Sequence, residues 1–375
     1  MIRERRGRHF RPALLLAVLV LFCCPWSAIA QSIRDFPPPP PAPTPKPTPT
    51  PAPPKDEDFE VIRVRTNLVM VPVSVVDAKG EPLRGLQLND FRLDEEGRTQ
   101  QIVEIGNPEE VPLDIALLFD VSSSVSQKGF FLFQQRAAAS FLKQVLKPVD
   151  RAAVFTIAAK PTLVSPLAPA ETATEKLMTI PAATSSVSTS FYDTVAAAAK
   201  YLDANSPARR RRVIVVISDG DDNSSELLQQ TLAEVRANQR IEPTRAASKE
   251  SLQFRHRRAT LDVQRAVQQV DAAFYSINPG GESIHLNEIS TRAQKAMESI
   301  AQSTGGTAFV PNGEADLQRV FTEVAAELRG QYLLQYYSNS QALGTQFRRI
   351  AVAVPARADL RVRARQGYYP KESKK

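Results

Sequence analysis

A carboxylate and a cluster of hydroxyls follow five apolar residues in the segment IALLFDVSSSVSQ. Within it, Asp120, Ser122 and Ser124 are spaced by two, so both hydroxyls can face one cation. Two further oxygen-bearing residues, Thr189 and Asp219, come later in the chain. Hydroxyl and carboxylate oxygens, without His or Cys, suit Mg²⁺, which keeps several waters and needs only one or two carboxylates. These residue types therefore predict a divalent-cation site.

Alternating strand and helix patterns surround these residues. Near-continuous apolar segments such as DIALLFD, RAAVFTI and RRVIVVIS alternate with amphipathic segments such as GFFLFQQRAAASFLKQVL. Buried strands joined by helices are typical of a parallel sheet that is covered on both faces. We therefore expect residues 111–330 to form a doubly wound, mainly parallel α/β domain, with a long basic helical insertion at about residues 226–269.

The predicted sheet would bring the candidate ligands together. Asp120 and Asp219 each follow a predicted strand, and Thr189 stands just before a predicted helix. In open α/β sheets, ligands bind beyond the carboxyl ends of the strands, so the three segments should converge at that edge. Few protein charges would leave a bound cation electrophilic. An acidic residue of a partner could then complete its coordination.

The segments on either side of the α/β pattern have a period of two. Residues 59–110 include the alternating valines of NLVMVPVSVV and a hairpin pattern around Glu96 and Gly97. Residues 331–370 contain QYLLQYYS, QFRRIAVAVP and LRVRARQGYY, which predict three more strands. We expect both segments to pair in one small antiparallel β-sandwich with the α/β domain inserted between them. The alternative is that each half stands alone.

The N-terminal residues predict export. Residues 1–30 combine several arginines, the apolar run ALLLAVLVLF and a small-residue site in SAIA, which is typical of a Sec signal peptide. The apolar run is too short to span a membrane. The residues after Arg5-Arg6 do not favour twin-arginine export, and the bulky residue before Cys23 does not favour lipid attachment. Residues 31–58 are rich in proline and predict an extended stalk. We expect a periplasmic or extracellular protein.

Composition excludes several kinds of site. Both cysteines, Cys23 and Cys24, lie in the predicted signal peptide, so the exported chain would have no disulfide, cysteine nucleophile or thiolate metal site. The formal net charge of +7 includes five arginines and one Glu in that peptide. The remaining basic residues concentrate in SPARRRRV and in residues 236–265, without interleaved aromatic residues. This pattern favours a solvated helix face, and we expect no nucleic-acid partner.

Three short motifs resemble, in their order along the chain, the metal-ion-dependent adhesion site of von Willebrand factor type A domains. They are D-x-S-x-S from Asp120, then Thr189, then Asp219-Gly220. The segment MESIAQSTGGTAFVPNGEADLQRVFTEVAAELRGQY resembles the end of such domains. The flanking segments VSVVDAKGEPLRGLQLNDFRLDEEGRTQQIVEI and LRVRARQGYYP resemble those of exported bacterial proteins with this domain, seen often in acidobacteria.

The resemblance implies a role for each ligand. Ser122 and Ser124 would bind Mg²⁺ directly, Thr189 would do so in the ligand-competent state, and Asp120 and Asp219 would act directly or through water. Mn²⁺ or Ca²⁺ could replace Mg²⁺. The chain departs from the family at residues 187–188, where Val and Ser stand in place of the usual glycines.

We therefore expect an exported, non-enzymatic binding module that uses its cation to bind an acidic group of a protein partner, in adhesion or complex assembly. One alternative is a structural scaffold in which the α/β domain binds no metal. A metal-dependent hydrolase is less favoured: in a haloacid-dehalogenase-type phosphatase the acid/base Asp would stand where Ser122 stands. The chain has no G-x-S-x-G or G-x-x-x-x-G-K-[ST] motif, and His256 and His285 have no motif partners.

Overall fold

The computed structural model describes residues 68–122, 131–184, 187–207, 209–240, 245–281, 287–339 and 345–370. The predicted signal peptide, the predicted stalk and the first residues of the N-terminal β unit, 59–67, lie outside these ranges. So do the candidate ligand Ser124 and His285. Within the described ranges, every helix is too short or too polar to cross a membrane.

The central sheet has six strands in the order β10-β9-β8-β5-β6-β7. They are β5 (Leu113–Asp120), β6 (Arg151–Ile157), β7 (Thr162–Ala168), β8 (Arg211–Ile217), β9 (Ala272–Ile277) and β10 (Ala308–Phe309). All neighbours are parallel except β7, which pairs with β6 in the antiparallel direction. The expected doubly wound, mainly parallel sheet is thus confirmed.

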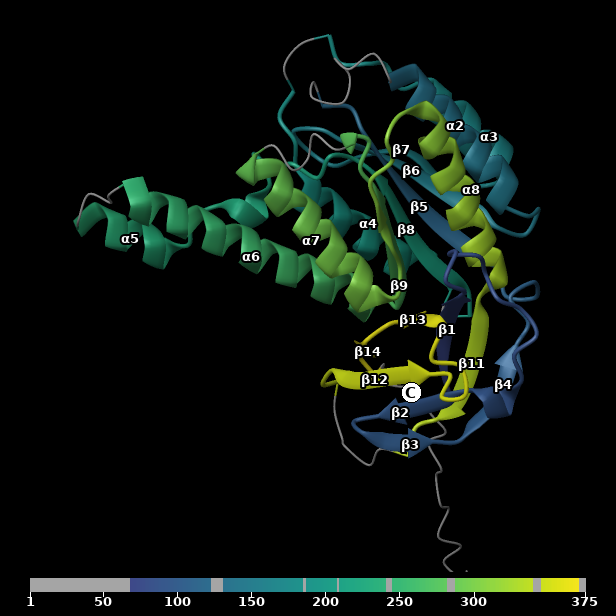
Figure 1. Ribbon diagram of the computed structural model, residues 1–375. Helices are drawn as coiled ribbons and strands as arrows, with labels where there is room; N and C mark the ends of the chain where they lie inside the picture. The colour runs from purple at the N-terminus through teal and green to yellow at the C-terminus, as the bar shows by residue number, and fades with distance from the viewer. Residues whose placement is uncertain are drawn as a thin grey trace, which may run out of the picture. The chain divides into compact units, whose positions relative to one another are not determined.

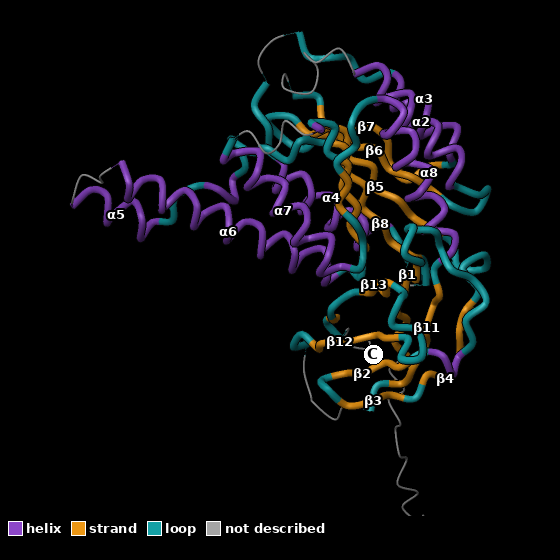
Figure 2. The backbone as a smooth tube through the Cα atoms, in the orientation of Figure 1, coloured by secondary structure: helices purple, strands orange, loops and turns teal. Residues whose placement is uncertain are grey.

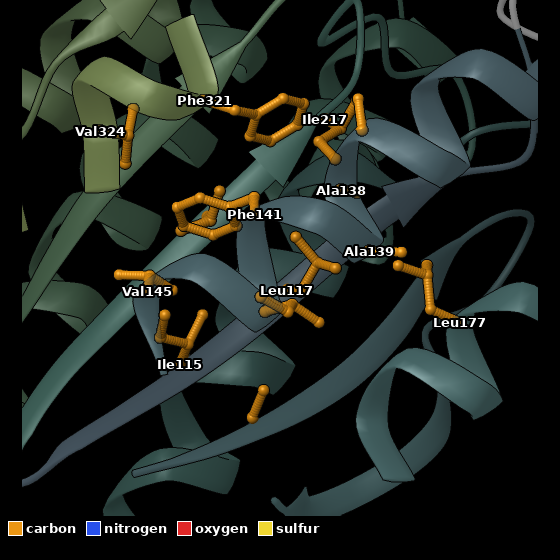
Figure 3. Packing of buried hydrophobic residues seen from close by; sticks show 14 of the residues in the cluster. Ile115, Leu117, Ala138, Ala139, Phe141, Val145, Leu177, Ile217, Phe321 and Val324 are labelled. Carbon is orange, nitrogen blue, oxygen red and sulfur yellow. The ribbon is translucent and has the colours of Figure 1, made fainter. Parts of the chain in front are cut away.

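Helices cover both faces of this sheet (Figures 1 and 2). One face carries α2 (Phe131–Val145), α3 (Ala170–Met178) and α8 (Glu314–Gly330), and the other carries α4 (Phe191–Asn205), α6 (Arg245–Gln269) and α7 (Glu288–Thr304). Successive residues of β5 point to opposite faces: Leu117 packs with the first layer and Leu118 with the second. In the first layer, the rings of Phe141 and Phe321 lie 5.4 Å apart (Figure 3).

The basic segment that we expected to be an insertion forms α5 (Leu232–Arg240) and α6, after a short 3₁₀ helix, η2 (Glu226–Leu228). Ala259, Val263 and Val267 of α6 are fully buried against α4 and α7. The second half of α6 is therefore part of the helical layer. Strand β7 and helix α3 were not predicted. Pro161 and Pro166 interrupt the strand pattern of β7 in the sequence. Proline is tolerated there because β7 lies at the edge of the sheet.

Two four-stranded sheets are built from the segments that flank the α/β domain. The first has the order β13-β1-β11-β4 and contains β1 (Leu68–Val76), β4 (Ile102–Gly106), β11 (Tyr332–Tyr337) and β13 (Arg361–Ala364). The second has the order β14-β12-β2-β3 and contains β2 (Arg92–Glu95), β3 (Arg98–Gln100), β12 (Arg348–Ala353) and β14 (Gly367–Tyr368). Apolar residues of both sheets form one cluster. Strands from before and after the α/β domain therefore pair, as in β1 with β11.

The predicted hairpin around Glu96 and Gly97 joins β2 to β3. Both turn residues have positive φ, 49° and 76°, as a two-residue hairpin turn requires. A 3₁₀ helix, η1 (Leu88–Asp90), precedes this hairpin.

Gly306 lies where the chain passes directly against β9. A Cβ added there would lie 2.0 Å from the carbonyl oxygen of Phe274 and 2.7 Å from its carbonyl carbon. We expect Gly306→Ala to lower the free energy of unfolding by more than about 2 kcal/mol, because the backbone of β9 would have to move. Urea unfolding measures this.

Gly330→Ala is the matched control. A Cβ at Gly330, the last residue of α8, would meet only the side-chain Cβ of Pro82, at 3.2 Å. We expect its free energy of unfolding to stay within about 1 kcal/mol of wild type. Equal free energies of unfolding for the two variants would contradict the inference that a Cβ at residue 306 displaces the backbone of β9.

Candidate metal site

Asp120, the last residue of β5, is fully buried at the carboxyl end of the sheet. Its carboxylate accepts a hydrogen bond from the backbone N–H of Ser122 at 2.7 Å and one from the hydroxyl of Ser218 at 2.5 Å. The Ser218 hydroxyl in turn accepts a bond from the N–H of Gly220 at 2.9 Å. Because β5 and β8 are parallel neighbours, these residues meet just beyond the strand ends. The bonds fix the orientation of the carboxylate.

Negative charge is concentrated at this edge. Burial, and then the neighbouring carboxylate of Asp219, raise the pKa of Asp120 to about 7, against the opposing effect of hydrogen bonds from Ser218 and Ser122. Burial, and then Asp219, also raises the pKa of Asp221. In the described ranges, no three His, Cys, Asp or Glu side chains are arranged to hold a metal ion. A cation here would therefore depend on hydroxyl oxygens and water as well.

Thr189 is held by the loop that follows β8. Its backbone N–H donates to the side-chain oxygen of Asn223 at 2.9 Å, and its carbonyl oxygen accepts bonds from the N–H groups of Asn223 and Ser224 at 3.0 and 3.1 Å. The next residue, Ser190, donates to the carbonyl of Ala158, just after β6, through both its N–H and its hydroxyl. The position of Thr189 is thus set from two neighbouring segments.

Asp222 caps α4 from outside that helix. Its carboxylate accepts bonds from the N–H of Tyr192 at 2.8 Å and from the N–H groups of Ser224 and Ser225 at 3.2 and 3.0 Å. Asp193 of α4 accepts in return from the N–H groups that open η2, at 2.6 and 3.3 Å. A carboxylate at the start of a helix satisfies free N–H groups and opposes the positive end of the helix dipole. The start of α4 and the loop after β8 are therefore joined.

The structure brings four of the five candidate ligands to this edge of the sheet. Asp120 is bonded to Ser122 and lies within electrostatic range of Asp219, and Thr189 is bonded to the loop that carries Asp219. The fifth, Ser124, is outside the described residues. Ser218 and Asn223 were not predicted from the sequence. Ser218 could have been found, because it is the polar residue that ends the apolar run RRVIVVIS. Asn223 stands in DDNSS, a sequence that indicates only a turn.

Asp120→Asn tests the cost of this buried charge. The folded-state pKa of about 7 lies above the ordinary value of 3.8, so the folded protein binds the proton more tightly. The contribution of Asp120 to the free energy of unfolding is therefore fully present at low pH and is lost as the pH rises through about 7. In EDTA at pH 8, we expect Asp120→Asn to be more stable than wild type by roughly 1 to 3 kcal/mol, and no difference below about pH 4.

Thermal unfolding across this pH range measures the effect. Asp262→Asn is the control, because Asp262 is an exposed carboxylate on α6 whose ion pair with Arg265 lies at the surface, at 3.8 Å. We expect it to change stability little at either pH. If Asp120→Asn were less stable than wild type at pH 8 in EDTA, the conclusion that the buried charge of Asp120 destabilises the metal-free protein would be wrong.

Comparisons with known proteins gave one family match and several similar solved structures. Residues 114–252 match the model of the von Willebrand factor type A domain. No curated protein matches the chain. Solved structures similar to it include a von Willebrand factor type A protein from Catenulispora acidiphila, with 12% identity and a TM-score of 0.42 over 71% of this chain and 51% of that chain. Our chain thus spans about half the length of that protein.

Two other solved structures are similar at low identity. The von Willebrand factor domain of the type V pilus tip protein Mfa5 from Porphyromonas gingivalis has 13% identity and a TM-score of 0.41, over 57% of this chain and 94% of that one. Proximal thread matrix protein 1 from the mussel byssus, with a zinc-occupied adhesion-site motif, has 13% identity and a TM-score of 0.41. The match covers 61% of this chain and 48% of that chain. The family assignment rests on the sequence match: residues 114–252 of this chain belong to the von Willebrand factor type A domain family.

Proposed function

We propose that this protein is an exported binding module whose type A domain holds Mg²⁺ at the carboxyl edge of the central sheet and binds an acidic group of a protein partner there. The hydroxyls of Ser122, Ser124 and Thr189 would bind the cation directly. The carboxylates of Asp120 and Asp219 would do so directly or through water. When bound, the cation supplies an electrophilic position for a carboxylate from outside the protein.

The observation that carries this proposal is the pair formed by Asp120 and Asp219. Asp120 is fully buried, and the charge of Asp219 makes its ionisation still less favourable. Neither carboxylate forms an ion pair with another residue in the part of the chain that the structure describes. A divalent cation would favour ionisation of both carboxylates.

The chemistry of the described donors fits Mg²⁺. All of them are oxygens, and two carboxylates are enough for an ion that retains several waters. Ser122 and Thr189 are only 2% and 5% exposed, so the partner must approach from the side on which the cation keeps water. Mn²⁺ and Ca²⁺ take the same kind of donor. An ion held by few protein charges keeps a strong attraction for a further carboxylate, which favours binding to a partner over a closed structural role.

Calorimetric titration with Mg²⁺ or Mn²⁺ tests the metal site. We expect the purified protein to bind the ion with measurable heat, and Asp120→Ala and Ser122→Ala to abolish that heat because each removes a ligand. Ser248→Ala, which removes an exposed hydroxyl on α6, is the matched control and should bind normally. Thermal unfolding of each variant checks that it is folded.

Three outcomes would count against the proposal. Heat that persists in both ligand variants would refute the assigned residues. A folded wild-type protein that gives no heat would favour a scaffold without metal. Metal-dependent turnover of phosphate or ester substrates would favour a hydrolase.

Asn223→Ala tests the positioning of Thr189. The substitution removes the acceptor for the backbone N–H of Thr189, at 2.9 Å, and leaves the Thr189 hydroxyl, the proposed metal-binding group, in place. We expect affinity for Mg²⁺ to fall about fivefold, because one hydrogen bond is worth on the order of 1 kcal/mol. Asn205→Ala, at the far end of α4, should leave affinity unchanged. Equal affinities in the two variants would show that Asn223 does not position the site.

A further inference from the structure

A groove of about 830 Å³ lies between α6 and α7, which cover the same face of the sheet as α4. Residues of both helices line it, including Arg257 and Leu261 of α6 and Arg292 and Lys295 of α7. We propose that this groove binds an acidic peptide segment of the protein partner, next to the carboxylate that the cation binds. The choice of partner rests on the proposed function.

The charge of the groove is the first argument. Arg257, Arg292 and Lys295 line it, and none of the three forms an ion pair with a residue in the described ranges. The one acidic residue among its described lining, Glu288, is already paired with Lys249 at 2.7 Å. Arg257 and Lys295 therefore have no acidic partner in the described ranges and can pair with an anionic ligand, and such complementarity guides association and selects partners.

A buried histidine, His256, also lies at the groove, close to two arginines. It is only 4% exposed, and its Nδ1 lies 3.3 Å from the hydroxyl of Tyr192. Burial, and then the charges of Arg292 and Arg255, lower the pKa of His256 to about 4. The imidazole is thus neutral at neutral pH, and the cations nearby disfavour any additional positive charge.

The groove is connected to the candidate metal site. Tyr192 links the two regions physically: its N–H donates to Asp222, and its hydroxyl contacts His256. In this proposal, a partner chain that places one carboxylate at the metal edge extends from there to the groove.

An acidic peptide fits this groove better than a nucleic acid. Single-stranded nucleic acids are usually bound by aromatic side chains that stack on bases, and the described lining contains no Phe, Tyr or Trp. Leu261, which is 52% exposed, offers an apolar contact beside the cations, as a peptide with mixed side chains would use. A segment rich in Asp and Glu would supply both the metal-bound carboxylate and the ion pairs of the groove.

Fluorescence anisotropy with a labelled oligoglutamate peptide tests the proposal, at low ionic strength and in either Mg²⁺ or EDTA. The double variant Arg257→Glu, Lys295→Glu reverses two exposed charges of the groove without touching a proposed ligand. We expect it to bind the peptide about tenfold more weakly than wild type in both buffers. The control is Arg136→Glu, Lys143→Glu on α2, which makes the same change in net charge on the other face of the sheet and should bind like wild type.

The outcomes separate the groove from the metal site. Unchanged binding by the groove variant, or equal weakening of both double variants, would overturn the proposal. Binding of a sulfated oligosaccharide but not of oligoglutamate would overturn the assignment to a peptide. Peptide binding that is lost in the groove variant but is the same in Mg²⁺ and EDTA would support the groove and count against the metal site. Metal-dependent binding that the groove variant leaves intact would support the metal site and count against the groove.

Discussion

A buried carboxylate at the end of a central strand constrains this protein more than any other group. All eight residues of β5 are buried, and the last of them is Asp120. Its hydrogen bonds from Ser122 and Ser218 offset only part of the cost of removing its charge from water, so its pKa stays high. A wholly apolar strand end would make a more stable sheet. The carboxylate is thus a position where stability is given up, as is common at binding sites.

The loop after β8 connects this strand end to the rest of the edge. It carries Asp219, and it also bonds Thr189 through Asn223 and caps α4 through Asp222. The loop is fixed at one end by β8, which lies beside β5, and at the other by the N-terminus of a buried helix. The geometry of the site therefore depends on packed elements, and one loop sets the spacing between its parts.

Much of this arrangement could be predicted from local patterns. β5 and β8 are recognisable because each is an almost unbroken apolar run, and the polar residues that end them mark the carboxyl edge of the sheet. The hairpin at Glu96-Gly97 is recognisable because its turn requires positive φ. β7 escaped prediction because it is a half-exposed edge strand interrupted by proline.

The missing parts of the site are contacts between distant segments. Ser218 matters because β8 lies beside β5, and Asn223 matters because its loop meets the one before α4. Neither relation leaves a periodic pattern in the sequence. The limits of the signal peptide, the stalk and the domains, and the part played by Ser124, stay predictions.

The pairing of β1 has a consequence for the order in which the chain folds. β1 lies between β11 and β13, and both of these strands are made only after the whole α/β domain. Val71 and Val73, fully buried in the folded protein, must therefore stay without their strand partners until the strands and helices between β4 and β11 have been synthesised. Closing so long a loop has an entropic cost, which falls once the folded domain brings Leu333 beside Gly106. Strand β1, the first in the described part of the chain, is then among the last to be paired, and until that moment its edges are open to other chains.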